Sequence, residues 1–265
     1  MANDLQRNRE WYLARKGKIT ASECYVLLNN SKEAMTEEEL KVWKENNPKS
    51  RVTTKEVPFS AGTYTYLDDK VAEMYMPENS FLEYMEECKF ETKAMQWGTF
   101  FEDGARNRYI EATGFEVLDA PFVPLKGFEY FAGGSPDGII RLGTSNQGGT
   151  NGIIEIKCPF NPAVHLKHYL FDTPEDLRND NLQYYAQCQY NMLCVEREFG
   201  YKVDFCDFIS YDPRTSKSKQ LKVLRIPADA EIQGLLLERT RLGVEYLRGQ
   251  IERINTMASI INTYN

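Results

Sequence analysis

Two short segments combine carboxylates with a lysine at a spacing that suits phosphodiester chemistry. The first is GSPDG at residues 134–138, and the second is IIEIKCPF at residues 153–160. Successive side chains of a β-strand point to opposite faces, so Glu155 and Lys157 are expected to share one face. Asp137 stands between a proline and a glycine, which are typical of a turn between two strands. Two carboxylates can then converge on one cation.

These residues predict a magnesium site. Magnesium prefers octahedral oxygen coordination and keeps several waters, so one or two carboxylates, a carbonyl and a phosphate oxygen suffice. Asp137, Glu155 and the backbone carbonyl of Ile156 supply that set. The metal would polarise the phosphodiester and lower the pKa of a bound water, and Mn2+ is expected to substitute for Mg2+. Lys157 would steady the attacking hydroxide or the charge that develops on the phosphate.

An Asp followed later by Glu-x-Lys is a weak pattern, and surface ion pairing is the alternative interpretation. The turn at Asp137 and the β-prone segment around Glu155, which ends in Cys-Pro-Phe, favour the catalytic interpretation. The two histidines, His165 and His168, stand three apart on an expected helix. A structural or surface role is favoured for them over catalysis or zinc binding.

Composition limits the possible classes of protein. The chain has 265 residues, 42% of them hydrophobic, and is long enough to bury a full core. No apolar run approaches the roughly 20 residues that span a bilayer, and the charged N-terminal segment lacks the apolar stretch of a secretory signal. We therefore expect a soluble, intracellular protein with no membrane partner.

The six cysteines show no C-x-x-C spacing, which argues against a zinc site and against a secreted disulfide framework. Only Cys24, Cys188, Cys194 and Cys206 could imitate an iron–sulfur site. Two of these lie in a helical pattern and one in a strand pattern, so no iron–sulfur cluster is expected.

The net charge of -7 is unusual for a protein that binds nucleic acid. The basic residues, however, gather in two clusters. One combines Arg7, Arg9, Arg15, Lys16 and Lys18 with two aromatic residues, and the other contains Arg214, Lys217, Lys219, Lys222 and Arg225 without an acid. Solvated faces are the alternative interpretation, but an acidic exterior with one basic groove or channel is compatible with DNA binding.

Periodicity and turn residues predict a mixed order of helices and strands. Helices are expected over 4–14, 20–28, 63–75, 81–90, 94–113, 181–196 and from 228 into the 250s, and strands over 116–118, 128–132, 138–142, 152–158, 203–211 and 220–226. Capping boxes are expected at Thr20 and Thr36, and Gly114 should end the long helix. Residues 29–58 are expected to form a helical excursion, and 144–152 a flexible surface hairpin loop.

Six segments resemble motifs of a known family, in the same order. They are RKGKITAS (15–22), GTFFE (98–102) followed by Ala105 and Arg106, SPDG (135–138), EIKCPF (155–160), YAQCQY (185–190) and YDPR (211–214). They are similar to motifs of the phage lambda exonuclease and YqaJ-type viral recombinase family, a branch of the PD-(D/E)XK nuclease superfamily. The ordered set covers about three quarters of the chain and is more specific than any single motif. Residues 29–58 and 144–152 depart from the pattern, and strand-separating wedge residues stay unassigned.

The resemblance implies an α/β (α+β) fold with a PD-(D/E)XK core, in which helices flank a central mixed β-sheet. A single exonuclease domain is expected over residues 1–265, with a helical part at about 1–113, a catalytic sheet core at about 114–226 and a C-terminal helix at about 228–257. The resemblance also implies that Asp137 and Glu155 bind metal and that Lys157 is the catalytic lysine. Glu102 would approach a second metal, or its waters, from a helix.

By the same resemblance, the pocket for a 5′ phosphate is formed by Arg15, Ser22, Ser135 and Gln187. A guanidinium, two hydroxyls and an amide beside the start of a helix make physical sense as an anion site. Ser22 as an ordinary first-turn residue and Gln187 as a buried structural amide are the alternatives. For Glu102 a functional role is favoured over a chance position, because an unpaired carboxylate among core aromatic residues is costly.

The implied activity is that of a Mg2+-dependent exonuclease on linear double-stranded DNA. It would degrade one strand in the 5′ to 3′ direction from 5′-phosphorylated ends, release mononucleotides and leave a 3′ overhang for a single-strand annealing protein. Family members form rings of three subunits, so a homotrimer in the cytoplasm of a phage's host is implied. The alternatives are a restriction or structure-specific endonuclease on the same fold, which would not need the end pocket, and an inert DNA-binding scaffold.

Overall fold

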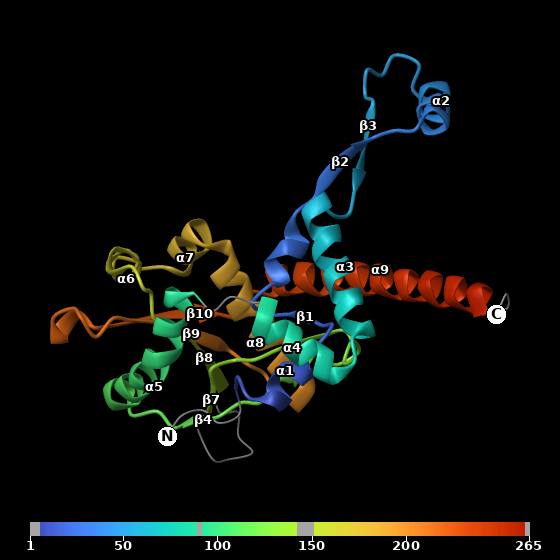
Figure 1. Ribbon diagram of the computed structural model, residues 1–265. Coiled ribbons are helices and arrows are strands. Elements are labelled where there is room, and N and C mark those ends of the chain that lie inside the picture. Colours follow the sequence, from blue (N-terminus) through green and yellow to red (C-terminus); the bar gives the residue numbers. More distant parts are fainter. Residues whose placement is uncertain (1–5, 89–91, 142–150, 263–265) are drawn as a thin grey trace.

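A five-stranded mixed sheet forms the centre of the protein. The computed structural model describes residues 6–88, 92–141 and 151–262 (Figure 1). The strands lie in the order β10 (Leu221–Pro227), β9 (Phe205–Tyr211), β8 (Asn151–Lys157), β7 (Gly138–Arg141) and β4 (Val117–Leu118). Neighbouring strands are antiparallel, except for β8 and β9, which are parallel.

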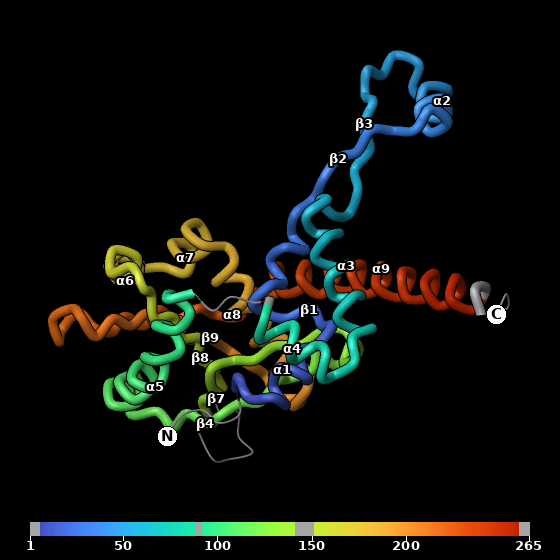
Figure 2. Tube along the Cα trace, in the orientation of Figure 1, coloured from blue at the N-terminus to red at the C-terminus, as the bar shows by residue number. Residues whose placement is uncertain are grey.

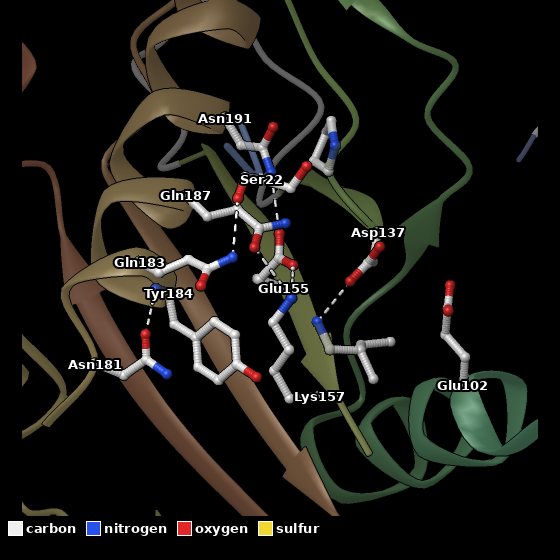
Figure 3. A network of polar contacts seen from close by, with 12 residues as sticks. Ser22, Glu102, Asp137, Glu155, Lys157, Asn181, Gln183, Tyr184, Gln187 and Asn191 are labelled. Carbon is white, nitrogen blue, oxygen red and sulfur yellow. Dashed lines mark hydrogen bonds and ion pairs between the residues drawn. The ribbon is translucent and has the colours of Figure 1, made fainter. Parts of the chain in front are cut away.

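A parallel pair needs a crossover connection, and three helices provide it. They are α6 (Pro162–Tyr169), α7 (Pro174–Asp180) and α8 (Leu182–Phe199). The chain therefore leaves the end of β8, passes through these helices and re-enters the sheet at β9. The carboxyl end of β8 and the first turns of α8 are thereby brought side by side (Figure 3).

Helices cover both faces of the sheet. Ile154 and Ile156 pack with Ala105 and Tyr109 of α5 (Lys93–Thr113), whereas Ile153 belongs to the larger core that contains α8. Side chains of β8 thus alternate between the two cores as predicted. Glu155 and Lys157, at odd-numbered positions like Ile153, share the face that α8 covers.

A second, three-stranded sheet joins the beginning of the chain to its middle. Its order is β1 (Ile19–Thr20), β6 (Ala132–Gly134) and β5 (Val123–Pro124), with β1 parallel and β5 antiparallel to β6. β6 leads directly into the Ser135–Asp137 turn and then into β7. This pairing places the segment around Thr20 next to the turn that carries Asp137.

The remaining elements surround these sheets. They are α1 (Arg9–Arg15), the short 3-10 helix η1 (Cys24–Leu28), α3 (Ala61–Tyr75), α4 (Glu78–Cys88), the 3-10 turn η2 (Lys217–Lys219) and α9 (Ala230–Asn262). α9 packs on α3, η1 and α8, accepts a hydrogen bond from Tyr75 of α3 as far along as Asn255, and extends beyond the body at its C-terminal end (Figures 1 and 2). No helix in the described parts of the chain is long and apolar enough to cross a membrane.

The segment predicted as a helical excursion at 29–58 is instead an arm. β2 (Ser31–Ala34) and β3 (Thr54–Val57) form an antiparallel ribbon with α2 (Glu37–Asn46) at its tip, and the arm projects from the body (Figure 1). The helix prediction failed at both ends because β-ribbon pairing, not local periodicity, orders them. The capping box at Thr36 is confirmed, with the Glu39 amide donating to Thr36 Oγ1 over 3.2 Å.

Other boundaries were predicted with mixed success. The long helix ends as expected at Gly114, which has φ of +70°. The prediction of a capping box at Thr20 was wrong, because Thr20 ends β1 and the short helix that follows begins only at Cys24. Residues 128–131 form turns, and the strand begins at Ala132. Most of the predicted loop at 144–152 lies outside the described residues; Asn151 and Gly152 belong to β8.

Candidate active site

Two carboxylates meet where β7 begins beside β8. The Asp137 amide donates to the Ile154 carbonyl over 3.1 Å, which continues the β7–β8 ladder by one residue. Asp137 Oδ2 accepts a 2.6 Å hydrogen bond from the Ile156 amide. Asp137 lies between Glu155 and Glu102 in Figure 3.

Lys157 and Asn191 hold the two oxygens of Glu155. Lys157 Nζ lies 2.7 Å from Glu155 Oε1, and Asn191 Nδ2 donates to Oε2 over 3.0 Å. The Glu155 side chain is 1% exposed, so a bare carboxylate there would be costly. Lys157 Nζ also donates to Gln187 Oε1 over 3.1 Å and lies 4.8 Å from the centre of the Tyr184 ring.

Asn191 is fully buried, and its Oδ1 has no hydrogen-bond partner. A Cβ atom at Gly134 would lie 2.3 Å from that oxygen, so only glycine leaves room for the amide in this position. The amide is therefore committed to Glu155 through its nitrogen. Sequence analysis did not single out Asn191, although its place four residues after Gln187 on a helix puts both on one face.

The carboxylates repel one another. Burial, then Glu155 and Glu102, raise the pKa of Asp137 well above its ordinary value. Burial also raises the pKa of Glu155, although Lys157 opposes that shift. Burial lowers the pKa of Lys157, but Glu155 and Asp137 outweigh it and the net shift is upward. The centre thus holds more negative charge than one lysine balances.

Two arginines brace the remaining acidic groups. Arg7 Nη2 lies 2.6 Å from Glu102 Oε2, and Arg7 adopts a positive φ of 60°. Arg106, one turn after Glu102 on α5, donates to the backbone carbonyl of Asp137 and pairs with Asp119 at 3.0 Å. Glu102 and the Asp137 turn are thereby tied to one helix. Arg7 was predicted only as part of a basic cluster, because nothing local pairs it with a residue 95 positions away.

The donor set fits a hard divalent cation. Three carboxylates, from α5, from β8 and from the turn before β7, supply oxygen ligands, and their mutual repulsion would be relieved by such a cation. Within the described residues, however, no group of three His, Cys, Asp or Glu side chains is already gathered as metal ligands. Glu102 faces Arg7 instead, so it would have to exchange partners to serve a metal.

A second polar cluster surrounds Arg15. Its Nη1 donates to Ser135 Oγ over 3.3 Å, and its Nη2 donates to Ser22 Oγ over 3.1 Å and to Thr20 Oγ1 over 3.3 Å. The guanidinium carbon lies 4.3 Å from the centre of the Trp11 ring. Burial lowers the pKa of Arg15. The guanidinium is thus a partly buried cation whose direct hydrogen bonds go to hydroxyl groups.

Three of the four residues predicted for the anion pocket therefore meet. Gln187 makes its hydrogen bond to Lys157, on the side of the carboxylates. Its neighbour Gln183, one turn earlier on α8, donates to the Ser22 carbonyl over 3.1 Å. Figure 3 shows the side chains of Gln183 and Gln187 pointing away from α8 on the same side, toward Ser22 and Glu155. α8 thus links the two polar clusters.

Some residues of each cluster line one cavity of about 1130 Å³, whereas Asp137, Glu155 and Ser135 lie outside its lining. Its lining includes Arg15 and Ser22 from the first cluster, and Glu102 and Lys157 from the second. Tyr184 and Trp11, which sequence analysis did not assign to the site, also line it. An anion held by Arg15 and a phosphodiester beside Lys157 would therefore share one space.

The comparisons with known proteins agree with this arrangement. Residues 10–198 match the family model of the YqaJ-like viral recombinase domain. The chain belongs to this family. The predicted resemblance is confirmed. No curated protein matches the chain.

The similarity to solved structures covers almost the whole chain. An alkaline exonuclease (LHK-Exo) from Laribacter hongkongensis is 25% identical, with a TM-score of 0.66 over 96% of this chain and 100% of that one. Its complex with dAMP gives 25% identity and a TM-score of 0.65 over the same shares. A phage-related exonuclease from Haemophilus somnus 129PT, at 16% identity and a TM-score of 0.50 over 89% of this chain and 96% of that one, shares the fold alone. The predicted fold class, a PD-(D/E)XK-type core with a mixed sheet between helices, is thereby confirmed.

Proposed function

We propose that this YqaJ-type protein is a Mg2+-dependent exonuclease that degrades one strand of linear double-stranded DNA from its 5′-phosphorylated end. Hydrolysis in the 5′ to 3′ direction would release nucleoside 5′-monophosphates and leave a 3′ single strand. The solved complex of the related alkaline exonuclease with dAMP supports a mononucleotide product. Its family and its structural neighbours support nuclease chemistry in general.

One observation carries the choice of a DNA end as the substrate. Arg15 is a partly buried cation that donates to three hydroxyl groups, and it lines the same cavity as Lys157. A terminal phosphate offers the anionic oxygens that such a group lacks, and charge-assisted hydrogen bonds to it would be strong. An endonuclease, which cuts within a strand, has no terminal phosphate to place there.

The residues of the second cluster have separate proposed roles. Asp137, Glu155, Glu102 and the Ile156 carbonyl would hold Mg2+, which supplies a polarised phosphodiester and a water of lowered pKa; Mn2+ would substitute. Lys157 would donate to the phosphate oxygen that gains charge or to the attacking oxygen. Gln187 and Tyr184 would orient Lys157, and Arg106 would fix the Asp137 turn. Ser22 and Ser135 would orient Arg15 toward the terminal phosphate.

The proposal is tested with three DNA substrates in Mg2+ or EDTA. Linear duplexes with a 5′ phosphate or a 5′ hydroxyl and a closed circular duplex are incubated with the protein, and products are separated by size. We expect mononucleotides from the phosphorylated duplex, slower release from the hydroxyl duplex and intact circles. Cutting of the circles would favour an endonuclease. An absence of cleavage under every condition would favour a DNA-binding scaffold.

Variants assign the two clusters separately. Lys157→Met should abolish cleavage on both ends and leave the preference in binding for a 5′ phosphate. Arg15→Ala should reduce the ratio of rates on phosphorylated and hydroxyl ends, because it removes the cation of the pocket. An unchanged ratio in Arg15→Ala would remove the anion pocket from the mechanism.

The proposed setting is phage recombination in the cytoplasm of the host. The 3′ strand would pass to a single-strand annealing protein, and three copies of the chain would form a ring around DNA. A ring would reconcile the net charge of -7 with DNA binding, because basic residues would face the channel. Sedimentation equilibrium tests the ring: a mass of three chains is expected, and a monomer at micromolar concentration would contradict it.

A further inference from the structure

Charged side chains lie next to the hydroxyl groups of the anion pocket. Thr20 Oγ1, which lies 3.3 Å from Arg15 Nη2, also donates to Glu23 Oε2 over 3.2 Å. The hydroxyl of Thr20 therefore connects the guanidinium to a carboxylate. Glu23 was considered in the sequence only as half of a capping box, which the structure does not contain.

The connection continues to a buried lysine on α3. Lys70 Nζ lies 3.5 Å from Glu23 Oε2 and 3.1 Å from Glu73 Oε1. Lys70 is 5% exposed and Glu73 is 6% exposed. Glu73 Oε2 in turn accepts a 2.9 Å hydrogen bond from the Gly17 amide, two residues after Arg15. The chain of contacts thus returns to the segment where it began.

The charges of four side chains in this connection balance one another. Arg15 and Lys70 carry positive charge, and Glu23 and Glu73 carry negative charge, and all four line the cavity. Glu73 is committed to Lys70 and to the Gly17 amide, both at shorter distances than the Lys70–Glu23 pair. Glu23 is the less tightly held carboxylate, and its side chain is 40% exposed.

Glu23 also acts on the guanidinium. Burial lowers the pKa of Arg15, and the charge of Glu23 is the largest of the influences that raise it. A terminal phosphate that binds Arg15 would enter the field of this carboxylate. Like charges within a partly buried site repel one another by amounts that alter affinity several-fold.

We propose that Glu23 weakens the hold of this pocket on a 5′ phosphate and that Lys70 limits that weakening. The inference rests on the proposed function, since it assumes that the pocket receives the phosphorylated end. Its consequence is specificity without tight retention: the hydroxyls and Arg15 select the phosphate, and Glu23 lets it leave. An exonuclease needs such release, because every cleavage creates a new end that must enter the same pocket.

The alternative is a purely structural role, in which Glu23 and Lys70 only join β1 and η1 to α3. Both roles predict some loss of stability when either residue is changed. They differ in binding, because a structural contact has no reason to favour a hydroxyl end over a phosphorylated one. The ratio of dissociation constants for 5′-hydroxyl and 5′-phosphate duplexes therefore separates them.

The test measures this ratio by fluorescence anisotropy, with short duplexes in Ca2+ to limit cleavage. Glu23→Gln keeps an oxygen for the Thr20 hydroxyl and removes the charge, so the ratio should rise about fivefold or more. Lys70→Met removes the cation that offsets Glu23, and the ratio should fall by a similar factor. Glu38→Gln, on the arm, makes the same change in net charge away from the cavity and should leave the ratio within about twofold of the original protein.

Product release gives a second readout. Inhibition of cleavage by dAMP should become stronger in Glu23→Gln and weaker in Lys70→Met, relative to inhibition by deoxyadenosine. Equal ratios and equal inhibition in all three variants, with each variant folded by circular dichroism, would overturn the inference. Arg15→Ala shows which idea has failed: if it abolishes the phosphate preference while Glu23→Gln changes nothing, only the role of Glu23 is wrong. If Arg15→Ala also changes nothing, the end pocket itself is wrong.

Discussion

Replacing Asp137 with asparagine should stabilise the metal-free protein while it abolishes cleavage. The asparagine keeps an oxygen to accept the hydrogen bond from the Ile156 amide and removes one of the charges that repel Glu155 and Glu102. Burial and these neighbours raise the pKa of Asp137, so the folded protein holds this proton to a higher pH than the unfolded chain does. Stability is then greatest below the ordinary pKa of aspartate and is lost as the pH rises through the raised value.

A buried charge without a partner is among the features that change the stability of a folded protein by about 0.5–3 kcal/mol. We expect Asp137→Asn to raise the free energy of unfolding by about 1–3 kcal/mol at pH 8 in EDTA, which corresponds to about 2–8 °C in melting temperature for a chain of this size. The difference should shrink at pH 4, where the original carboxyl is protonated in the folded protein and about half protonated in the unfolded chain.

The assay is thermal unfolding followed by circular dichroism at the two pH values, with and without Mg2+. Adding Mg2+ should stabilise the original protein more than the variant, because binding to the folded state adds stability. Asp69→Asn, at an exposed position of α3, serves as the control and should leave the melting temperature nearly unchanged. A variant less stable than the original protein in EDTA at pH 8 would refute the view that the carboxylates repel one another.

Three further substitutions test single contacts. Asn191→Leu leaves Glu155 Oε2 without its donor, so cleavage should fall about 10- to 100-fold while the far-ultraviolet spectrum is kept; a rate within twofold of the original would remove Asn191 from the site. Tyr109→Phe removes a 2.6 Å hydrogen bond to Asp207 and should cost about 1–2 kcal/mol in urea unfolding, with cleavage little changed; equal stability would contradict a role for this bond. Burial lowers the pKa of His168 to about 4, so the folded state binds fewer protons than the unfolded chain and stability is lost as the pH falls from about 6.5 through 4. His168→Gln should remove about 2–3 kcal/mol of that fall, and equal pH profiles of the two proteins would argue against it.

The sequence predicts best what depends on neighbouring residues. Alternation along 153–158 placed Glu155 and Lys157 on one face and two isoleucines on the other, because the period of a strand is a local property. Gly114 ended the long helix for a similar reason, since it alone supplies the left-handed backbone at the right place. Local rules of this kind need no knowledge of the rest of the chain.

What the sequence missed depends on residues that are distant along the chain. The ribbon of the arm depends on pairing between distant residues, such as Ser31 with Val57. The periodicity of the sequence does not indicate that pairing. Arg7 reaches Glu102 across 95 positions. Gln187 was placed by resemblance with Arg15, yet its hydrogen bond goes to Lys157 because the crossover brings α8 over the end of β8. Motif order identified the parts, and the fold decided which of them touch.

The parallel pairing of β1 with β6 also determines the order in which the parts of the candidate site can assemble during synthesis. Ile19 pairs with Ala132, so the polar cluster around Arg15 can form only after more than one hundred further residues have left the ribosome. Asp137 and Glu155 lie only 18 positions apart and can meet early, but Gln187 and Asn191 reach them only after the crossover is made. Contacts so far apart in sequence form slowly. A nascent chain therefore lacks the complete candidate site until α8 has been synthesised.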